Sequence, residues 1–174
     1  MKKSIGLWQL VGFAFTSLFG TLLHFLYDWV GSDLVAPFSA VNESTWEHMK
    51  LLFFPLFVFA IIEYFFWGKE NDIFWCVKLR GTLLGLIMIP VLFYTYNGVL
   101  GKSPDWVNIS IFFISAAITY IWETRKFNKD NMICKKPYLS FAALCVIALL
   151  FVVFTFLTPK IPIFRDPITM LYGK

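Results

Sequence analysis

The most reactive stretch of the sequence is residues 42–50, which read Asn-Glu-Ser-Thr-Trp-Glu-His-Met-Lys. Carboxylates, an imidazole and an ammonium group meet there in a chain that is otherwise strongly apolar. On a helix Glu43 and Glu47 share one face, and His48 lies about 100° round from Glu47. Carboxylates combined with imidazoles suit zinc or another borderline divalent metal. The same groups can also act as general acids and bases toward a substrate.

The other histidine of the chain, His24, belongs to an earlier apolar run, and Asp28 follows it one helical turn later. Ionisable residues inside membrane helices normally face the bundle interior or a water-filled cavity. Both histidines fall at the same predicted depth. We therefore expect His24, Glu43, Glu47 and His48 to bind a ligand or a metal, with a divalent ion such as zinc as the implied cofactor.

A purely structural role would explain the same residues. Asn42 or Ser44 is the expected start of a helix, and Ser44-x-x-Glu47 fits a capping box there, where acidic side chains also complement the helix dipole. Glu47 and Lys50 would then form a surface ion pair. The metal pattern is weak, because the paired histidines of a zincin helix are missing. The functional and the structural interpretation both stay open at this point.

The composition places the chain in a membrane. Of its 174 residues 59% are hydrophobic and 15% are charged, whereas about 25% of the residues of a soluble domain are charged. The net charge of +4 leaves no basic face for nucleic acid. An odd number of cysteines without C-x-x-C spacing predicts small apolar or weakly polar fillers rather than disulfides. The three are Cys76, Cys134 and Cys145.

Five apolar runs are long enough to cross a bilayer, which takes about 20 helical residues. We predict an all-α integral membrane bundle of five transmembrane helices, formed by one domain over residues 1–174. The stretch 28–48 is too apolar for a solvated loop, so we expect it to be re-entrant or interfacial. The predicted spans cover residues 5–27, 49–67, 79–100, 106–123 and 138–158.

The lysine and arginine distribution predicts that the N-terminus lies inside and the C-terminus outside. With that topology the inner segments hold twice as many of these residues as the outer ones. The inner set is Lys2, Lys3, Lys69, Lys78, Arg80, Arg125, Lys126, Lys129, Lys135 and Lys136. The outer set is Lys50, Lys102, Lys160, Arg165 and Lys174.

At the outer side we expect a cavity around the two histidines, roofed by the 28–48 stretch and the C-terminal tail. The residues expected to line it are Asp28, Asn42, Tyr94, Asn97, Arg165 and Asp166. At the inner side two carboxylates are expected to form structural ion pairs with nearby basic residues. These are Glu63 with Lys78 or Arg80, and Glu123 with Arg125 or Lys126.

The run Asn42-Glu43-Ser44-x-Trp46-Glu47-His48-x-Lys50, preceded by His24 and followed by Asp166-Pro167, resembles a family of small multi-pass bacterial membrane proteins of unknown function. The resemblance covers nearly the whole chain. It implies a bacterial cytoplasmic membrane and nothing about activity. A superfamily of membrane hydrolases that includes alkaline ceramidases places several histidines around zinc across seven helices. This chain, with five predicted helices and two histidines, departs from that pattern, so we assign none of that superfamily's functional residues to it.

Two functions remain from the sequence. The first is a metal- or ligand-binding cavity that supports a hydrolytic or lipid-modifying reaction at the outer leaflet. The second is a non-catalytic accessory, lipid-binding or partner-binding protein whose polar cluster is structural. Membrane lipid is the expected partner in both. Five helices are few for a lone transporter, so transport would need a homo-oligomer or a membrane partner.

Overall fold

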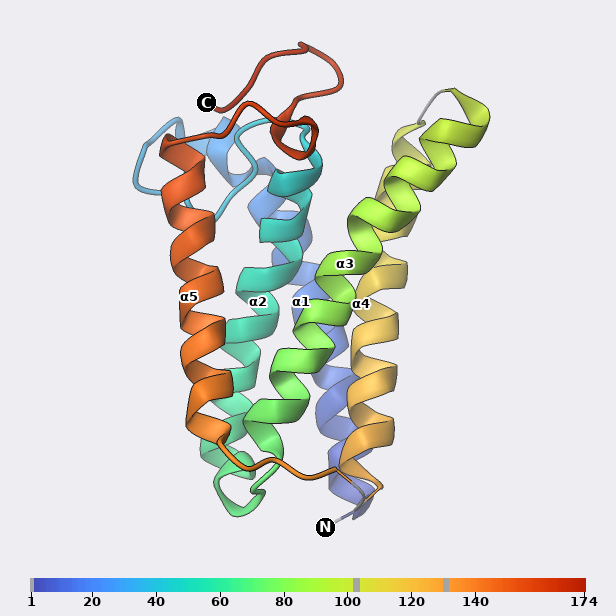
Figure 1. The fold of residues 1–174 in the computed structure, drawn as a ribbon, viewed down its shortest axis with the longest axis vertical. Helices are drawn as coiled ribbons and strands as arrows, with labels where there is room; N and C mark the ends of the chain where they lie inside the picture. The colour runs from blue at the N-terminus through green and yellow to red at the C-terminus, as the bar shows by residue number, and fades with distance from the viewer. Residues whose placement is uncertain (1, 102–103, 130–131) are drawn as a thin grey trace.

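In the computed structural model, which describes residues 2–101, 104–129 and 132–174, five long helices run up and down in alternation (Figure 1). All five are long and apolar enough to span a membrane, so the prediction of an all-α bundle with five spans is confirmed. They are α1 (Lys2–Val30), α2 (Thr45–Phe66), α3 (Phe74–Leu100), α4 (Asp105–Phe127) and α5 (Pro137–Phe156). Two short 3₁₀ helices, η1 (Gly68–Glu70) and η2 (Pro162–Phe164), follow α2 and α5.

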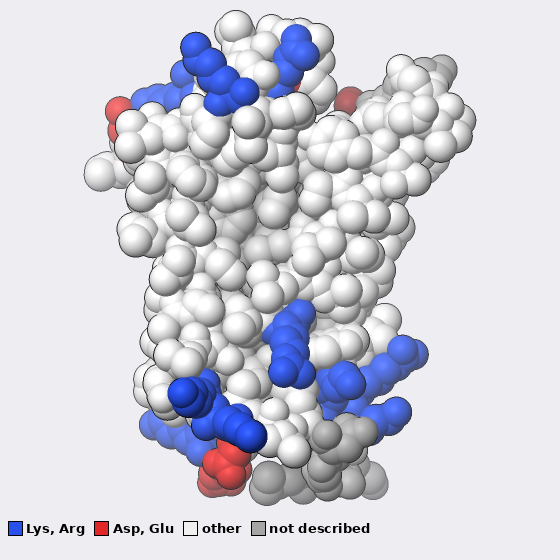
Figure 2. Space-filling view, viewed as in Figure 1, with Lys and Arg blue, Asp and Glu red and all other residues white. Residues whose placement is uncertain are grey.

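The bundle has two ends of different composition. The N-terminus and the α2–α3 and α4–α5 connections lie at one, which we call the N-terminal end (Figure 1). The loop of residues 31–44, the α3–α4 connection and the C-terminal tail lie at the other, the tail end. In the face shown in Figure 2, basic side chains gather mainly around the N-terminal end, and a wide uncharged zone separates them from a smaller group at the tail end. Such a zone is what a lipid bilayer requires.

Glycines on α1 allow close helix packing. A Cβ on Gly12 would lie 2.6 Å from the ring of Phe59 in α2. A Cβ on Gly20 would lie 2.8 Å from the backbone oxygen of Leu51, also in α2. Side chains at these positions would force the helices apart, so the small residues set the distance between α1 and α2. This close approach fixes His24, one turn beyond Gly20, beside the start of α2.

The loop of residues 31–44 folds back onto the bundle. The hydroxyl of Ser39 accepts a hydrogen bond from the backbone N–H of Tyr27 at 2.8 Å and donates one to the carbonyl of Leu23 at 2.6 Å. Lys50 donates from Nζ to the carbonyl of Ala36 at 2.8 Å. Ala36 and Ser39 are both fully buried. Protein groups therefore replace the water that this backbone would otherwise need.

The helix α2 begins as predicted, with Ser44 as its N-cap. The Ser44 hydroxyl accepts from the N–H of Glu47 at 3.4 Å. A capping box has a second hydrogen bond, from the N–H of the N-cap residue to the Glu side chain. That bond is missing here, because the Glu47 carboxylate accepts from the N–H of Val41 at 3.0 Å instead. The N–H of Ser44 donates to Asn42 Oδ1 at 2.9 Å. Glu47 thus ties the incoming loop to the first turn of α2.

The cysteine prediction was wrong for two of the three residues. Cys76 in α3 and Cys134, which precedes α5, form a disulfide with their Cα atoms 6.0 Å apart. They are 58 residues apart in the sequence, and the packing of α3 against α5 brings them together at the N-terminal end. Spacing along the chain gives no sign of such a pair. Cys145 is free and exposed.

Candidate metal centre

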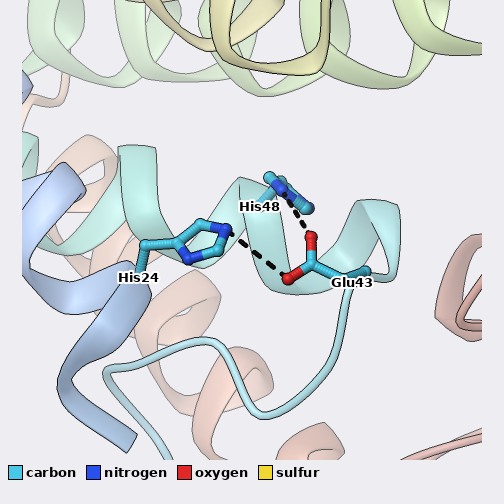
Figure 3. Close-up of side chains that lie close together, drawn as sticks. All are labelled: His24, Glu43 and His48. Atoms are coloured by element: carbon cyan, nitrogen blue, oxygen red, sulfur yellow. Dashed lines mark ion pairs between the residues drawn. The ribbon is translucent and has the colours of Figure 1, made fainter. Parts of the chain in front are cut away.

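His24, Glu43 and His48 converge at the tail end (Figure 3). His24 comes from α1, Glu43 from the loop and His48 from the first turn of α2. His24 Nε2 lies 3.6 Å from Glu43 Oε1, and His48 Nε2 lies 3.5 Å from Glu43 Oε2. One ligand atom from each residue lies within 4.8 Å of the others. Among the described residues this is the only such group of three histidine, cysteine or acidic side chains.

The imidazole of His48 is held in a defined tautomer. Its Nδ1 lies 3.0 Å from the carbonyl oxygen of Ser44, and a carbonyl can only accept, so Nδ1 carries the hydrogen. Nε2 is then left to face Glu43 with a lone pair, or with a second proton. Metal-binding histidines are commonly oriented in this way by a backbone carbonyl. A lone pair and a carboxylate oxygen repel each other unless a cation or a proton lies between them.

The Glu43 carboxyl is ionised at neutral pH. The His24 imidazole, 3.6 Å from Oε1, lowers the pKa of Glu43, and the charge of His48 acts in the same direction against the opposing effect of burial. Its side chain is 39% exposed, whereas that of His48 is 18% exposed. The group therefore offers a negative oxygen ligand at the edge of the bundle, with two imidazole nitrogens beside it.

The donor set and its spacing suit a zinc ion. Zinc bonds of about 2.0–2.2 Å to nitrogen and oxygen place tetrahedral ligand atoms roughly 3.4 Å apart. Each imidazole Nε2 lies near that distance from a different oxygen of Glu43, His24 at 3.6 Å from Oε1 and His48 at 3.5 Å from Oε2. Two histidines with one glutamate is also a donor set of catalytic zinc sites. Three protein ligands leave a fourth position open for water or substrate. The residues present therefore fit the ion that the sequence implied.

A cavity of about 450 Å³ borders all three candidate ligands. Its volume falls in the range of small-molecule sites, about 300–1,000 Å³. The apolar part of its wall consists of Phe25, Leu51, Ile109, Phe112, Phe113 and Ile168. The polar part adds Thr21, Asp105 and Asn108 to the three ligands. The cavity therefore offers apolar surface for a hydrocarbon chain and polar groups for a polar head.

Glu47, the fourth predicted ligand, has different partners. Its side chain is buried, and Oε2 lies 2.6 Å from Lys50 Nζ. Lys50, fully buried, also donates to Thr155 Oγ1 in α5 at 3.0 Å. The ion pair predicted for the surface is thus in the interior. Because Glu47 points about 100° away from His48, its carboxylate turns toward the loop and away from the three converging residues.

The six residues predicted to line the cavity do not border it. Asn42 Nδ2 donates to the carbonyl of Gly173 at 2.8 Å, which docks the tail. Asp166 is buried and accepts from Thr169 and from the N–H of Ile168, both at 2.8 Å, within the tail itself. The four others are Asp28, Tyr94 and Arg165, which are exposed, and Asn97, which is half-buried.

The prediction missed every cavity-lining residue other than the three candidate ligands, and three of those missed lie near the mouth of the bundle or in the tail. Asp105 and Asn108 lie in the first turn of α4, and Ile168 reaches over from the tail. The signal available for the first two was the Asp-x-x-Asn pattern directly after Pro104, where a helix starts at the predicted outer side. Ile168 carries no such signal, because its position depends on the fold of the tail.

The five helices and the group of two histidines and a carboxylate define a multi-pass membrane protein with a candidate metal centre at one end. Over its whole length, residues 1–174, the chain matches the model of DUF6512, a family of unknown function, and it belongs to that family. No curated protein matches the chain, and no solved structure does. The match agrees with the resemblance seen in the sequence, while the bacterial origin stays a prediction.

Proposed function

We propose that the protein binds one divalent metal ion, zinc by its donor set, through His24, Glu43 and His48. The ion would supply an activated water for a hydrolytic, lipid-modifying reaction on an amphipathic substrate in the neighbouring cavity. The observation that carries the proposal is the convergence of two imidazoles and a carboxylate from three separate segments, with one ligand atom of each within 4.8 Å of the others. The carbonyl of Ser44, which holds His48 Nδ1, supports it further.

We place the tail end at the extracytoplasmic face of a bacterial cytoplasmic membrane. The excess of lysine and arginine in the segments at the N-terminal end favours this orientation, and the family resemblance implies the bacterial membrane. The centre then lies at the level of the outer leaflet. An amphipathic lipid could keep its chain against the apolar wall while its head reached Asp105, Asn108 and the metal.

A non-catalytic role is the second candidate, and one observation favours it. Several polar residues of the 42–50 stretch hold the loop or the tail in place, among them Asn42, Glu47 and Lys50. In that case the protein is a lipid-binding or accessory subunit, alone or as a homo-oligomer, and the polar cluster fixes the outer loop. The two candidates differ in whether His24 and His48 bind metal.

Metal analysis of the purified full chain separates them. We expect one equivalent of zinc per chain after dialysis against micromolar zinc, and its loss in His24→Ala and His48→Ala. Asp28→Asn is the matched control, since this exposed carboxylate lies one turn from His24 on the same helix. Absence of bound divalent metal from the wild type would refute the proposal. Unchanged zinc content in both histidine variants would refute the assigned ligands.

A further inference from the structure

A second polar cluster lies within the bundle toward the N-terminal end, away from the candidate metal centre. Lys78 of α3 forms ion pairs with Glu63 of α2 and with Glu123 of α4, the latter at 2.6 Å. Gln9 of α1 donates from Nε2 to Glu63 Oε1 at 2.7 Å. All four side chains are at most 2% exposed. The partners predicted for Glu123, Arg125 and Lys126, are not the ones it has, because Glu123 faces inward on α4.

The charges of this cluster do not balance. Two carboxylates face one ammonium group, so full ionisation would leave a net negative charge buried among apolar side chains. The titratable groups around Glu123 are Lys78 from α3, Glu63 from α2 and Tyr120 from α4, while α1 contributes the neutral Gln9. Among the described residues, no other cation pairs with either carboxylate. An uncompensated buried charge is strongly unfavourable and is usually removed by protonation.

The polar contacts show which carboxylate oxygen has no partner at all. Glu63 Oε1 accepts from Gln9, and Glu63 Oε2 forms an ion pair with Lys78, although it takes part in no hydrogen bond. Glu123 has a partner on one oxygen only, Lys78 on Oε2, and its Oε1 is buried with neither a hydrogen bond nor an ion pair. A Cβ on Gly81 would lie 2.5 Å from that Oε1, so the oxygen packs directly on the backbone of α3. A helix interior has no free N–H to donate, but its carbonyls keep a lone pair that can accept.

A second buried acceptor without a donor lies beside the same cluster. Gln9 Oε1 has no hydrogen-bond partner within the described chain, although its Nε2 is engaged with Glu63. The cluster therefore has an excess of acceptors as well as an excess of negative charge. One added proton on Glu123 removes the excess charge and turns its Oε1 into a donor, while Gln9 Oε1 keeps no partner. A bound metal cation would need several more oxygen ligands, and Lys78 already occupies the position between the carboxylates.

We propose that this cluster is a proton-binding site and that Glu123 holds the proton on Oε1 in the folded protein. Glu63 stays ionised and pairs with Lys78, and the neutral Glu123 carboxyl donates to a backbone carbonyl of α3. The site joins α1, α2, α3 and α4. It is independent of the metal centre, because it shares no residue with it.

Infrared spectroscopy of the full chain in detergent at neutral pH tests the proposal. A protonated carboxyl has a C=O stretching band that ionised carboxylates lack, and the band shifts in D₂O. We expect the band in the wild type and its loss in Glu123→Gln. Glu63→Gln should also lose it, because Lys78 then balances the one remaining carboxylate, whereas the exposed control Glu70→Gln should keep it. Labelling with ¹³C-glutamate must shift the band. If Glu123→Gln does not fold, Gly81→Ala must shift it too, since the new methyl group meets Glu123 Oε1.

Three results would overturn the inference. Absence of the band from the wild type would mean that both carboxyls are ionised. A band whose frequency does not move in Gly81→Ala would put the proton on Glu63 instead, because the new methyl group meets Glu123 Oε1. A melting temperature that rises with sodium concentration at constant ionic strength, and that no longer does so in Glu123→Gln, would identify a metal cation as the neutralising ligand.

Discussion

Replacing Lys50 with methionine tests the structural half of the 42–50 stretch. Lys50 is fully buried and pairs with the buried Glu47 at 2.6 Å. Removing one partner of a buried ion pair leaves the other charge uncompensated, at a cost of about 3–5 kcal/mol. The carbonyl of Ala36 also loses its donor, which costs about 1–3 kcal/mol where no water replaces it. We expect Lys50→Met to lower the free energy of unfolding by about 4 kcal/mol or more.

A double-mutant cycle separates the charge from the packing. Glu47→Gln alone strands the ammonium group and should cost about 3 kcal/mol. The double variant removes both charges, so it should be more stable than Lys50→Met alone, with a coupling of about 2 kcal/mol or more. Reversible unfolding in mixed detergent measures these values, and the exposed Lys160→Met serves as the control. Additive effects, or a Lys50→Met loss below about 1 kcal/mol, would refute the buried-pair reasoning.

Zinc affinity should fall as the pH is lowered, because protons compete with the metal for the two imidazoles, while Glu43, whose pKa is lowered by His24, stays ionised longer. Titration calorimetry at several pH values checks this. Gly81→Ala should destabilise the bundle by about 1–3 kcal/mol, since its methyl group meets Glu123 Oε1 at 2.5 Å. Gly98→Ala on the same helix has open space and should be neutral or stabilising. Maleimide labelling without reductant should modify Cys145 alone, and mass spectrometry counts the labels.

The features that followed from local pattern were predictable. Length and hydropathy gave the five helices, and the Ser44 signal gave the start of α2. Those that depended on long-range packing were not. Lys78 reaches Glu123 only because α3 and α4 pack face to face, and Cys76 meets Cys134 only because α3 lies against α5. The spacing of these residues along the chain predicts neither the ion pair nor the disulfide.

The sequence predicted which residues gather near the candidate site, but not which of them converge as ligands and which support the loop. His24, Glu43 and His48 come together, whereas Glu47 does not join them. The 3.6-residue helical turn separates Glu47 and His48 by about 100°, but it does not say which of them faces the cavity. That choice depends on where the 31–44 loop lies, and Lys50 decides it by binding the loop at Ala36.

The structural and the functional interpretation of residues 42–50 therefore complement each other. Glu43 is a loop residue, and a ligand on an unanchored loop could not keep a 3.5 Å separation from His48. Glu47 fixes the loop at Val41, and Asn42 fixes it to the tail through Gly173. These contacts lie immediately before Glu43 and limit where its carboxylate can go. The buried ion pair thus acts as the support of the candidate metal centre, and the capping and binding roles belong to one arrangement of neighbouring side chains.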